Sequence, residues 1–453
     1  MHPMPFRLSM AALAAGLALG TPLAAQAQSL KELYEAARAY DATYLAAKSF
    51  ADSADFKAEQ ARAAWRPSVN LSSSATRSTA DTPYSSTLST DTTSVQAALS
   101  GQQTLYNAAT NPTIAQAERG VDVARSQLRA AEQDLIVRLS QAYFDMLASA
   151  DALGTVLASK TAIAEQLASA KRNFEVGTAT ITDTREAQAR YDLALAQEVA
   201  AENDLRVKRL ALEQLVGRTG VKPHPLGPAQ ALPALLPAEV EPWVGAADTT
   251  NPSIEQARLA YEVAKLETEK ARAAQGPTVA LTGSYAKSHI SVGGNAAVQN
   301  QIVPYSGSGN GTNASIGVTL TMPLFAGYSI QNRIRETLAL EDKARNDLEG
   351  ARRSVAQGTR TAFFGVQSGL SQVKALEAAE QSSKLSLEAT QLGYKVGVRV
   401  NLDVLNAQTQ LYTTQRDLAK ARYDVLVGSL KLRQATGQLV PADIDAIDPL
   451  LVR

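Results

Sequence analysis

The chain has 453 residues and a balanced charge, with 44 basic and 44 acidic side chains, and it contains no cysteine. Balanced charge argues against a polyanionic partner such as nucleic acid. Without cysteine the chain cannot form disulfides, a thiolate metal site or a lipid-modified N-terminal cysteine. The three histidines lie in no metal-binding or catalytic motif, so we expect a protein that is not an enzyme and binds no metal or cofactor.

The N-terminus has the three parts of a secretory signal peptide. Arg7 is followed by the Ala- and Leu-rich run 8–19, and residues 25–27 (AQA) supply a small-x-small cleavage site. We therefore predict that residues 1–27 are a signal peptide. The run is too short and too broken by glycine for a membrane-spanning helix, and no later segment approaches one. The mature chain is expected to be soluble, extracellular or inserted as a β-barrel.

The two halves of the chain are similar in sequence and form an internal repeat. The segments "FEVGTATITDTREAQARYD" (174–192) and "YKVGVRVNLDVLNAQTQLY" (394–412) align at an offset of 220, and Pro67 aligns with Pro277 at an offset of 210. A tandem match of this kind indicates a duplicated structural unit. The predicted organisation is a signal peptide (1–27), a first repeat (28–220), a Pro-rich connector wrapped on the outside (221–250), a second repeat (251–439) and a similar C-terminal tail (440–453).

Each repeat is predicted to contain one β-hairpin, at about 66–105 and about 277–324. Apolar and polar residues alternate there over segments of about 10 residues, which is the period of a strand and enough to cross a bilayer at a tilt. The Ser-, Thr-, Gly- and Asn-rich segments 78–92 and 289–311 are interpreted as exposed connections. The same alternation also fits one wall of a soluble β-sandwich.

Aromatic residues favour the membrane alternative. They cluster where each hairpin meets its flanking helices, as an interfacial belt does: Trp65, Tyr106, Phe325 and Tyr328. Four strands cannot close a barrel, and an open sheet edge is not tolerated in lipid. A barrel therefore requires strands from several chains.

The remaining sequence predicts helices. Segments 29–64 and 252–274 have good helix composition, and segments 107–172 and 329–391 contain no proline except Pro112. The two longer segments could each run for about 90 to 100 Å at 1.5 Å per residue. Their Ala- and Ser-rich composition favours a broad wall of laterally packed helices over a two-stranded coiled coil.

The tandem halves, the leader and the motifs "FEVGTATITD", "YKVGVRVNLDVL" and "LYTTQRDLAKARYDVL" resemble the TolC family of outer-membrane channel-tunnels over about residues 29–440. The resemblance implies a mixed α and β membrane protein, a homotrimer with a twelve-stranded outer-membrane β-barrel to which each chain gives four strands. This barrel continues into a long periplasmic α-helical barrel with a closed tip. The implied location is the outer membrane of a Gram-negative bacterium, with a large periplasmic portion.

The resemblance also places the two quoted turns at the periplasmic tip and implies a gate network there. Its residues are Gln166, Thr182, Asp183, Gln391, Tyr394 and Arg399. Tyr394 is expected to reach Asp183, and Arg399 to reach the region of Thr182 and Asp183. Gln391 stands where the family has an acid opposite Gln166, so this link is expected to lack charge assistance and to be weaker.

A pore constriction is implied as well. The family carries two aspartates three residues apart on one helix face, and here Asp403 matches the first while Asn406 replaces the second. We expect a trimer with three carboxylates at the constriction, still cation-selective but less prone to block by multivalent cations. The alternative is that Asp403 only caps the helix that follows the turn.

The implied function is passive conduction through the exit duct of a tripartite export system. Polypeptides in type I secretion, or small molecules in drug efflux, would reach it from an inner-membrane transporter of the ABC, RND or MFS type through a periplasmic adaptor. The composition also allows a secreted helical filament or a surface-layer subunit, and the long helices allow a periplasmic adaptor. The filament or surface-layer alternative does not explain the two β-hairpins or the repeated tip motif. An adaptor would need one helical hairpin with lipoyl-like and β-barrel segments around it, whereas this chain has two helical units.

Overall fold

The protein is described by a computed structural model that covers residues 28–82, 85–227, 232–299 and 301–452, so the predicted signal peptide lies outside the described residues. Long helices and four strands follow one another in an order that repeats. The elements are α1 (Leu30–Tyr40), α2 (Ala42–Arg62), η1 (Ala63–Trp65), β1 (Ser68–Thr82), β2 (Ser85–Asn107), α3 (Thr110–Glu175), α4 (Ile181–Val216), α5 (Glu241–Thr250), α6 (Pro252–Ala273), β3 (Thr278–Val298), β4 (Gln301–Thr321), α7 (Ser329–Lys395), α8 (Asn401–Thr436), α9 (Ala442–Ile447) and η2 (Asp448–Leu450).

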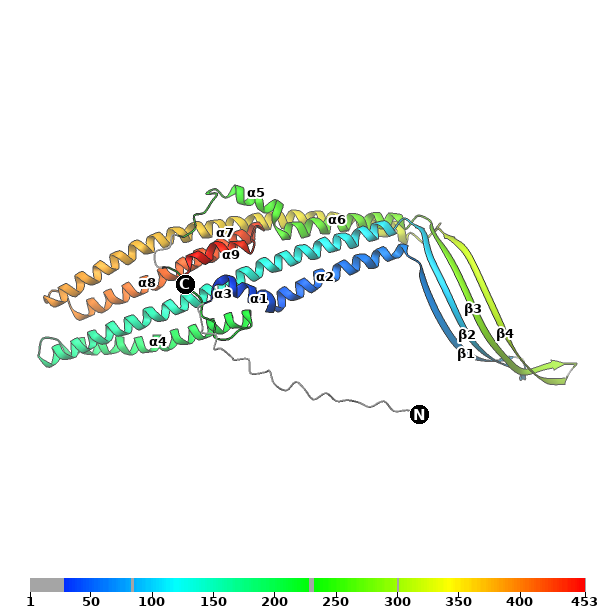
Figure 1. Ribbon diagram of the computed structural model, residues 1–453, viewed down its shortest axis with the longest axis horizontal. Helices are drawn as coiled ribbons and strands as arrows, with labels where there is room; N and C mark the ends of the chain where they lie inside the picture. The colour runs from blue at the N-terminus through cyan, green and yellow to red at the C-terminus, as the bar shows by residue number, and fades with distance from the viewer. Residues whose placement is uncertain (1–27, 83–84, 228–231, 300, 453) are drawn as a thin grey trace, which may run out of the picture.

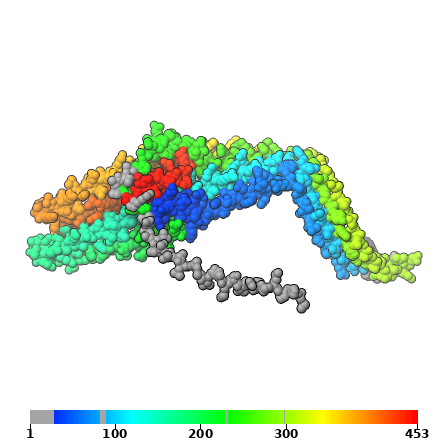
Figure 2. All heavy atoms as spheres, in the orientation of Figure 1, coloured from blue at the N-terminus to red at the C-terminus, as the bar shows by residue number. Residues whose placement is uncertain are grey.

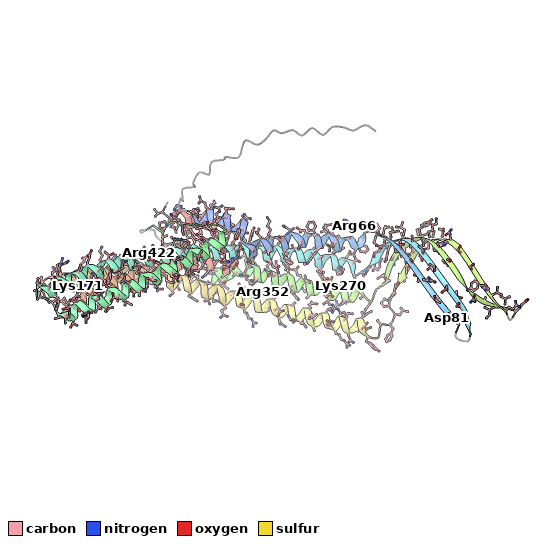
Figure 3. The ribbon with its side chains drawn as sticks, turned by 90° about the horizontal axis from the view of Figure 1, so that it is seen from below. Arg66, Asp81, Lys171, Lys270, Arg352 and Arg422 are labelled. Carbon is pink, nitrogen blue, oxygen red and sulfur yellow. The ribbon has the colours of Figure 1, made fainter. Side chains whose placement is uncertain are left out.

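The molecule is elongated (Figure 1). One end consists of two helical hairpins, α3 with α4 and α7 with α8, and at the other end the strands leave the helices as a sheet that bends away from them. In Figure 3, Lys171 lies near the hairpin tips, Lys270 lies near the start of the sheet, and Asp81 lies toward the far end of the strands. The space-filling view shows the helical body thickest in its middle, where the blue, green and red segments gather (Figure 2).

The two longest helices are continuous, as predicted. α3 has 66 residues and α7 has 67, which corresponds to about 100 Å at 1.5 Å per residue. Pro112 does not interrupt α3, because it lies in the first helical turn, where a missing N–H costs no intrahelical hydrogen bond. None of the described helices contains an apolar stretch long enough to cross a membrane.

The four strands form one antiparallel sheet in the order β1-β2-β3-β4. The register aligns apolar residues across it, since Leu71 pairs with Leu99 and Leu99 with Tyr285. This apolar face carries the following exposed side chains: Val69, Leu71, Leu99, Tyr285, Ile316, Val318 and Leu320. The opposite face is rich in hydroxyl groups, and there the Ser284 and Ser315 hydroxyls lie 2.8 Å apart. Within the part of the chain that the structure describes, no helix covers either face (Figure 1).

The strands are longer than the predicted segments, with 15, 23, 21 and 21 residues. The prediction that 78–92 and 289–311 are exposed connections was wrong, because most of their described residues pair in the strand ladders. Ser, Thr, Gly and Asn are typical of loops. Here the hydrogen bonds between neighbouring strands hold the backbone extended whatever the polarity of the side chains.

The largest core lies in the middle of the helical body, where α1, α3, α4, α8 and α9 meet. Phe144 of α3 stacks on Tyr423 of α8 with the ring centroids 5.7 Å apart. The C-terminal tail was expected to wrap the outside, but Ile444 and Ile447 of α9 are only 1% and 3% exposed. These two side chains, three residues apart, give the short helix one apolar side that closes the core.

Candidate functional site

The repeated motif forms two turns of the same conformation at the hairpin tips. Gly177 and Gly397 have φ angles of 78° and 80°, in the left-handed region that glycine adopts without strain. In each turn, the two residues after the glycine donate their N–H groups to the carbonyl four residues before it, that of Asn173 or Gly393, at 2.8 and 3.1 Å. The repeat in sequence is therefore a repeat of backbone geometry.

Polar links join the α3–α4 hairpin to the α7–α8 hairpin within one chain. Asn173 Nδ2 donates to the Tyr394 hydroxyl at 3.1 Å. Gln166 Nε2 donates to Asn401 Oδ1, and Asn401 Nδ2 donates to the backbone carbonyl of Asp183 at 3.4 Å. Asn401 is only 2% exposed, so this first residue of α8 is a buried latch between α3 and α4. Sequence reasoning missed it.

A small apolar core lies beside these links. Leu405 of α8 is fully buried and packs with Ile163 and Leu167 of α3 and Ala187 of α4. Burial of a leucine side chain stabilises by about 1.5 to 3 kcal/mol, whereas a polar link of this kind contributes about 1 kcal/mol. Of these contacts, burial of Leu405 therefore contributes most to holding the α7–α8 hairpin against the α3–α4 hairpin.

Tyr394 was expected to bond to Asp183, but within the chain its partner is Asn173. The Asp183 carboxylate bonds instead within its own hairpin. Its Oδ2 accepts from the Thr180 N–H at 2.9 Å and from the Thr180 hydroxyl at 2.7 Å, and the Asp183 N–H donates back to Thr180 Oγ1 at 3.2 Å. Together these bonds form a capping box at the start of α4.

The other two expected links of the gate also differ within the chain. Within the chain Arg399, in the turn before α8, has a different partner, since its Nη1 lies 3.6 Å from Oδ2 of Asp403 in the first turn of α8. Gln166 is bonded to the latch described above, and Gln391 makes no side-chain hydrogen bond among the described residues. The structure thus gathers the expected gate residues at one end of the molecule with a different pairing, and their role in gating stays a prediction.

The two copies of the turn differ at one position that changes the role of the carboxylate. Thr180 has φ and ψ of −90° and 159°, and Val400 has −96° and 161°. Val400 has no hydroxyl, so α8 begins without a side-chain cap. Asp403 therefore does not cap its helix as Asp183 does, and its carboxylate, 37% exposed, is free to face Arg399.

The second residue of the expected constriction has a different neighbour. Asn406 Oδ1 accepts a hydrogen bond from Arg190 Nη2 of α4 at 3.0 Å. Asp403 lies beside Arg399 of the preceding turn, whereas Asn406 is tied to the α3–α4 hairpin. A pore-lining role for both residues stays a prediction.

The four aromatics singled out in the sequence lie where the sheet meets the helices. Trp65 ends η1, Tyr106 is the last but one residue of β2, and Phe325 and Tyr328 lie between β4 and α7. The rings of Phe325 and Tyr328 meet edge to face at 5.7 Å, and these residues are 76% and 66% exposed. Their position fits a belt at one membrane surface, which stays a prediction.

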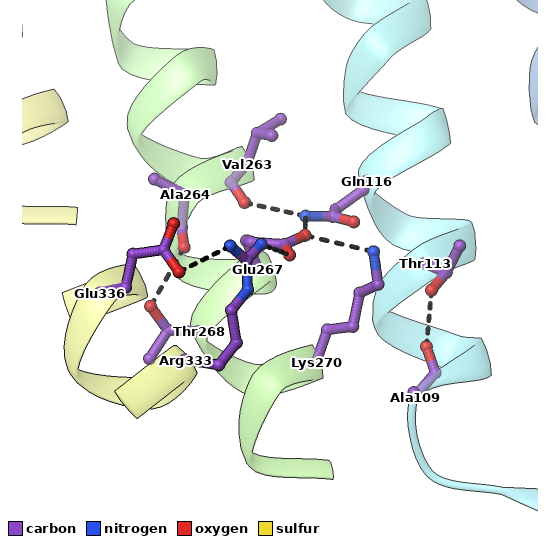
Figure 4. Close-up of polar contacts among 10 residues, drawn as sticks. All are labelled: Ala109, Thr113, Gln116, Val263, Ala264, Glu267, Thr268, Lys270, Arg333 and Glu336. Carbon is purple, nitrogen blue, oxygen red and sulfur yellow. Dashed lines mark hydrogen bonds and ion pairs between the residues drawn. The ribbon is translucent and has the colours of Figure 1, made fainter. Parts of the chain in front are cut away.

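A charged cluster ties α3, α6 and α7 together near the helix ends that adjoin the sheet (Figure 4). Glu267 of α6 accepts from Gln116 of α3 at 2.9 Å and pairs with Arg333 of α7 at 2.7 Å and with Lys270 at 3.3 Å. Burial acts to raise the pKa of Glu267, but these hydrogen bonds outweigh it and hold the pKa below its usual value. Glu267 thus holds α3, α6 and α7 together at the ends that adjoin the sheet.

A buried polar contact ties α8 to α3 at the edge of the largest core, in the middle of the helical body. The Tyr423 hydroxyl donates to Asp151 Oδ2 at 2.6 Å, and Tyr423 is 4% exposed. Burial raises the pKa of Asp151, and the hydrogen bond from Tyr423 opposes this rise. A single acid in a long Ala-rich helix carries no signal of such a contact, so the sequence did not reveal it.

Uncovered antiparallel strands set on a body of helices about 100 Å long define the fold of an outer-membrane channel, and solved structures match it. VceC of Vibrio cholerae matches with a TM-score of 0.73 and 20% identity, over 90% of this chain and 96% of that one. CusC matches with a TM-score of 0.74 and 17% identity, over 91% and 92%.

Sequence comparison gives the family. The model for outer membrane efflux proteins matches residues 33–218 and 243–438, one segment in each repeat. The chain is 32% identical to the outer membrane protein TolC of Vibrio cholerae, over 94% of this chain and 95% of that protein. It is also 32% identical to the alkaline protease secretion protein AprF of Pseudomonas aeruginosa, over 77% and 71%. The chain therefore belongs to the outer membrane efflux protein family, a family of transport proteins of the outer membrane.

Proposed function

We propose that three copies of the chain form the outer-membrane exit duct of a tripartite export system. Cargo passes from an inner-membrane transporter of the ABC, RND or MFS type, through a periplasmic adaptor, into the helical part of the duct and out through the barrel. The relatives named for efflux and for protease secretion support both small molecules and polypeptides as cargo. Conduction is passive, and no covalent step takes place in this chain.

The observation that carries this proposal is the open sheet. β1 and β4 lie at its two edges, each paired on one side only, and every residue of β4 is exposed in the single chain. Unpaired backbone groups cannot remain in lipid. Pairing β4 of one copy with β1 of the next removes all edges, and three copies supply twelve strands.

The proposed gate is the contact between the two hairpins at the tip. Docking of the adaptor and transporter releases Tyr394 from Asn173 and draws Asn401 and Leu405 out from between α3 and α4. Arg399 and Thr182 are exposed in the single chain, and in the proposed trimer they pair across neighbouring copies. Each exposed link contributes about 1 kcal/mol or less and burial of Leu405 about 1.5 to 3 kcal/mol, so docking has to supply a few kcal/mol per copy to open the tip.

Single-channel conductance in planar bilayers tests this function. The comparison is between the unmodified protein and a Tyr394→Phe, Arg399→Ser double variant. A matched control makes the same two chemical changes away from the tip, Tyr261→Phe on α6 and Arg353→Ser on α7. Small cation-selective steps that grow several-fold in the tip variant, and not in the control, are expected.

Two results would contradict the proposal. Large conductance steps from the unmodified protein would support the channel but contradict the proposed gate at the tip. An absence of steps from a verified membrane-inserted trimer would favour the filament or surface-layer alternative.

A further inference from the structure

The charged side chains of the strands are confined to one face of the sheet. In the described strands they are Arg77, Asp81, Asp91 and Lys287, and side-chain alternation and register place all four on the face that carries the apolar residues. The hydroxyl-rich face carries no charged side chain among the described residues. In membrane β-barrels, charged side chains ordinarily face the water-filled interior. Their position on the apolar face of this sheet is therefore unusual and needs an explanation.

The two basic residues occupy equivalent positions in the two repeats. Arg77 lies nine residues after Ser68, the first residue of β1, since 77 minus 68 is nine. Lys287 lies nine residues after Thr278, the first residue of β3, since 287 minus 278 is also nine. The offset of 210 is the one that aligns Pro67 with Pro277. Each repeat therefore places one long cationic side chain nine residues from the base of its first strand. Along the hydrogen-bonded rows Arg77 is level with Ser291, four residues beyond Lys287, and the stagger between tilted strands of a closed barrel compensates an offset of this kind.

That position coincides with the far border of a membrane. Nine residues extend about 30 Å along a strand, or about 21 to 25 Å vertically at the tilt of 35 to 45° usual for barrels. The apolar band of outer-membrane barrels is about 25 Å tall. The near border is marked by Trp65 and Phe325 at the base of the strands. Between the borders the face carries Val69, Leu71 and Tyr285, all well exposed.

Both cations are available to a ligand. Neither Arg77 nor Lys287 takes part in an ion pair among the described residues, and both are exposed. Asp91, the nearest acid on this face, accepts a hydrogen bond from the Thr79 hydroxyl at 2.5 Å. His289 lies on the same face beyond Lys287, with its ring nitrogen 2.8 Å from Asn310 Oδ1.

We propose that Arg77 and Lys287 bind the phosphate groups of lipid headgroups in the outer leaflet. The inference rests on the proposed function, because closure of three copies with the apolar face outward arranges two cations per chain into a ring of six. Guanidinium and ammonium groups suit phosphate oxygens, and their apolar stems can lie along the upper edge of the apolar band. The ring fixes the depth at which the barrel sits in the membrane.

Lipid binding by the full-length protein in detergent tests this proposal. The probes are lipid A carrying two phosphates and the same lipid after removal of both, with the bound fraction measured by native mass spectrometry. The variant is Arg77→Gln, Lys287→Gln. The control is Lys48→Gln, Lys384→Gln, which removes two exposed lysines from α2 and α7 that have no ion pair among the described residues.

The unmodified protein and the control are expected to prefer the phosphorylated lipid by about tenfold, the effect of one or two charge-assisted contacts. The Arg77→Gln, Lys287→Gln variant is expected to lose most of this preference while still binding the dephosphorylated lipid. Equal preference in that variant, or no preference in the unmodified protein, would overturn the proposal. Single-channel conductance of the same samples tests the proposed channel independently. A negative result for lipid binding can therefore be told apart from a negative result for channel formation.

Discussion

Val400→Thr would convert the second tip turn into a copy of the first. The backbone angles of Val400 differ from those of Thr180 by only 6° in φ and 2° in ψ, from −96° and 161° against −90° and 159°. A threonine hydroxyl at position 400 is therefore placed to accept from the Asp403 N–H. The Asp403 carboxylate can then accept from the N–H of residue 400, as Asp183 does from Thr180 at 2.9 Å.

The expected gain is about 1 kcal/mol per chain, the usual difference between a threonine cap and an apolar residue at this position. The side chain of Asp403 would leave Arg399, now 3.6 Å away, and turn toward the backbone. Since that contact is exposed, its loss costs at most a few tenths of a kcal/mol. The helix start should become more stable, and the carboxylate should become less available to ions in the pore.

Two measurements on the purified protein check this reasoning. Thermal unfolding followed by circular dichroism should show a higher midpoint, and the cation selectivity of single channels should fall. Thr180→Val, the reverse change at the first turn, should lower the midpoint and leave the selectivity unchanged. A Val400→Thr variant with unchanged stability would refute the cap argument, and unchanged selectivity together with raised stability would place Asp403 outside the conducting path.

Three further outcomes are expected from thermal unfolding in detergent. Glu267→Gln should cost about 1 to 3 kcal/mol at pH 7; because the folded pKa of Glu267 is lowered, this loss should fade as the pH falls below about 4. Tyr423→Phe should destabilise more at pH 7 than at pH 4, because it leaves Asp151, whose pKa burial already raises, charged without its donor. Gly437→Ala should cost more than Gly177→Ala. Both glycines have positive φ, but an added Cβ at Gly437 would lie 2.4 Å from the Thr250 carbonyl oxygen, whereas at Gly177 it would meet nothing within 4 Å.

The sequence predicted the helices and the presence of two hairpins because both depend on local patterns. Helix composition without proline and period-2 alternation are visible in a single chain. The extent of the strands was not predictable in this way. Segments 78–92 and 289–311 have the composition of loops, and only hydrogen bonds to neighbouring strands make them part of the sheet.

The tip shows the same limit at the level of single residues. The repeat located the two turns and their glycines, but the pairing of side chains depends on how the hairpins pack. Asn401 and Leu405 are buried by that packing, and neither has a counterpart of the same type in the first copy, where Ile181 and Arg185 align with them. One signal was present in the sequence: Val400 aligns with Thr180, and this exchange alone predicts an uncapped helix.

In the described strands the hydroxyl-rich face of the sheet carries no charged side chain, which has a consequence for what the proposed duct exports. In the closed barrel that we propose, this face is the inner wall, and the hydroxyls of residues such as Ser72, Ser100, Ser284 and Ser315 keep it wet without fixed charge. Acidic and basic cargo meet the same wall, and neither is retained by it on the way out. The barrel therefore does not select cargo by charge. The same outer-membrane channel can serve export systems whose cargo molecules are chemically unrelated.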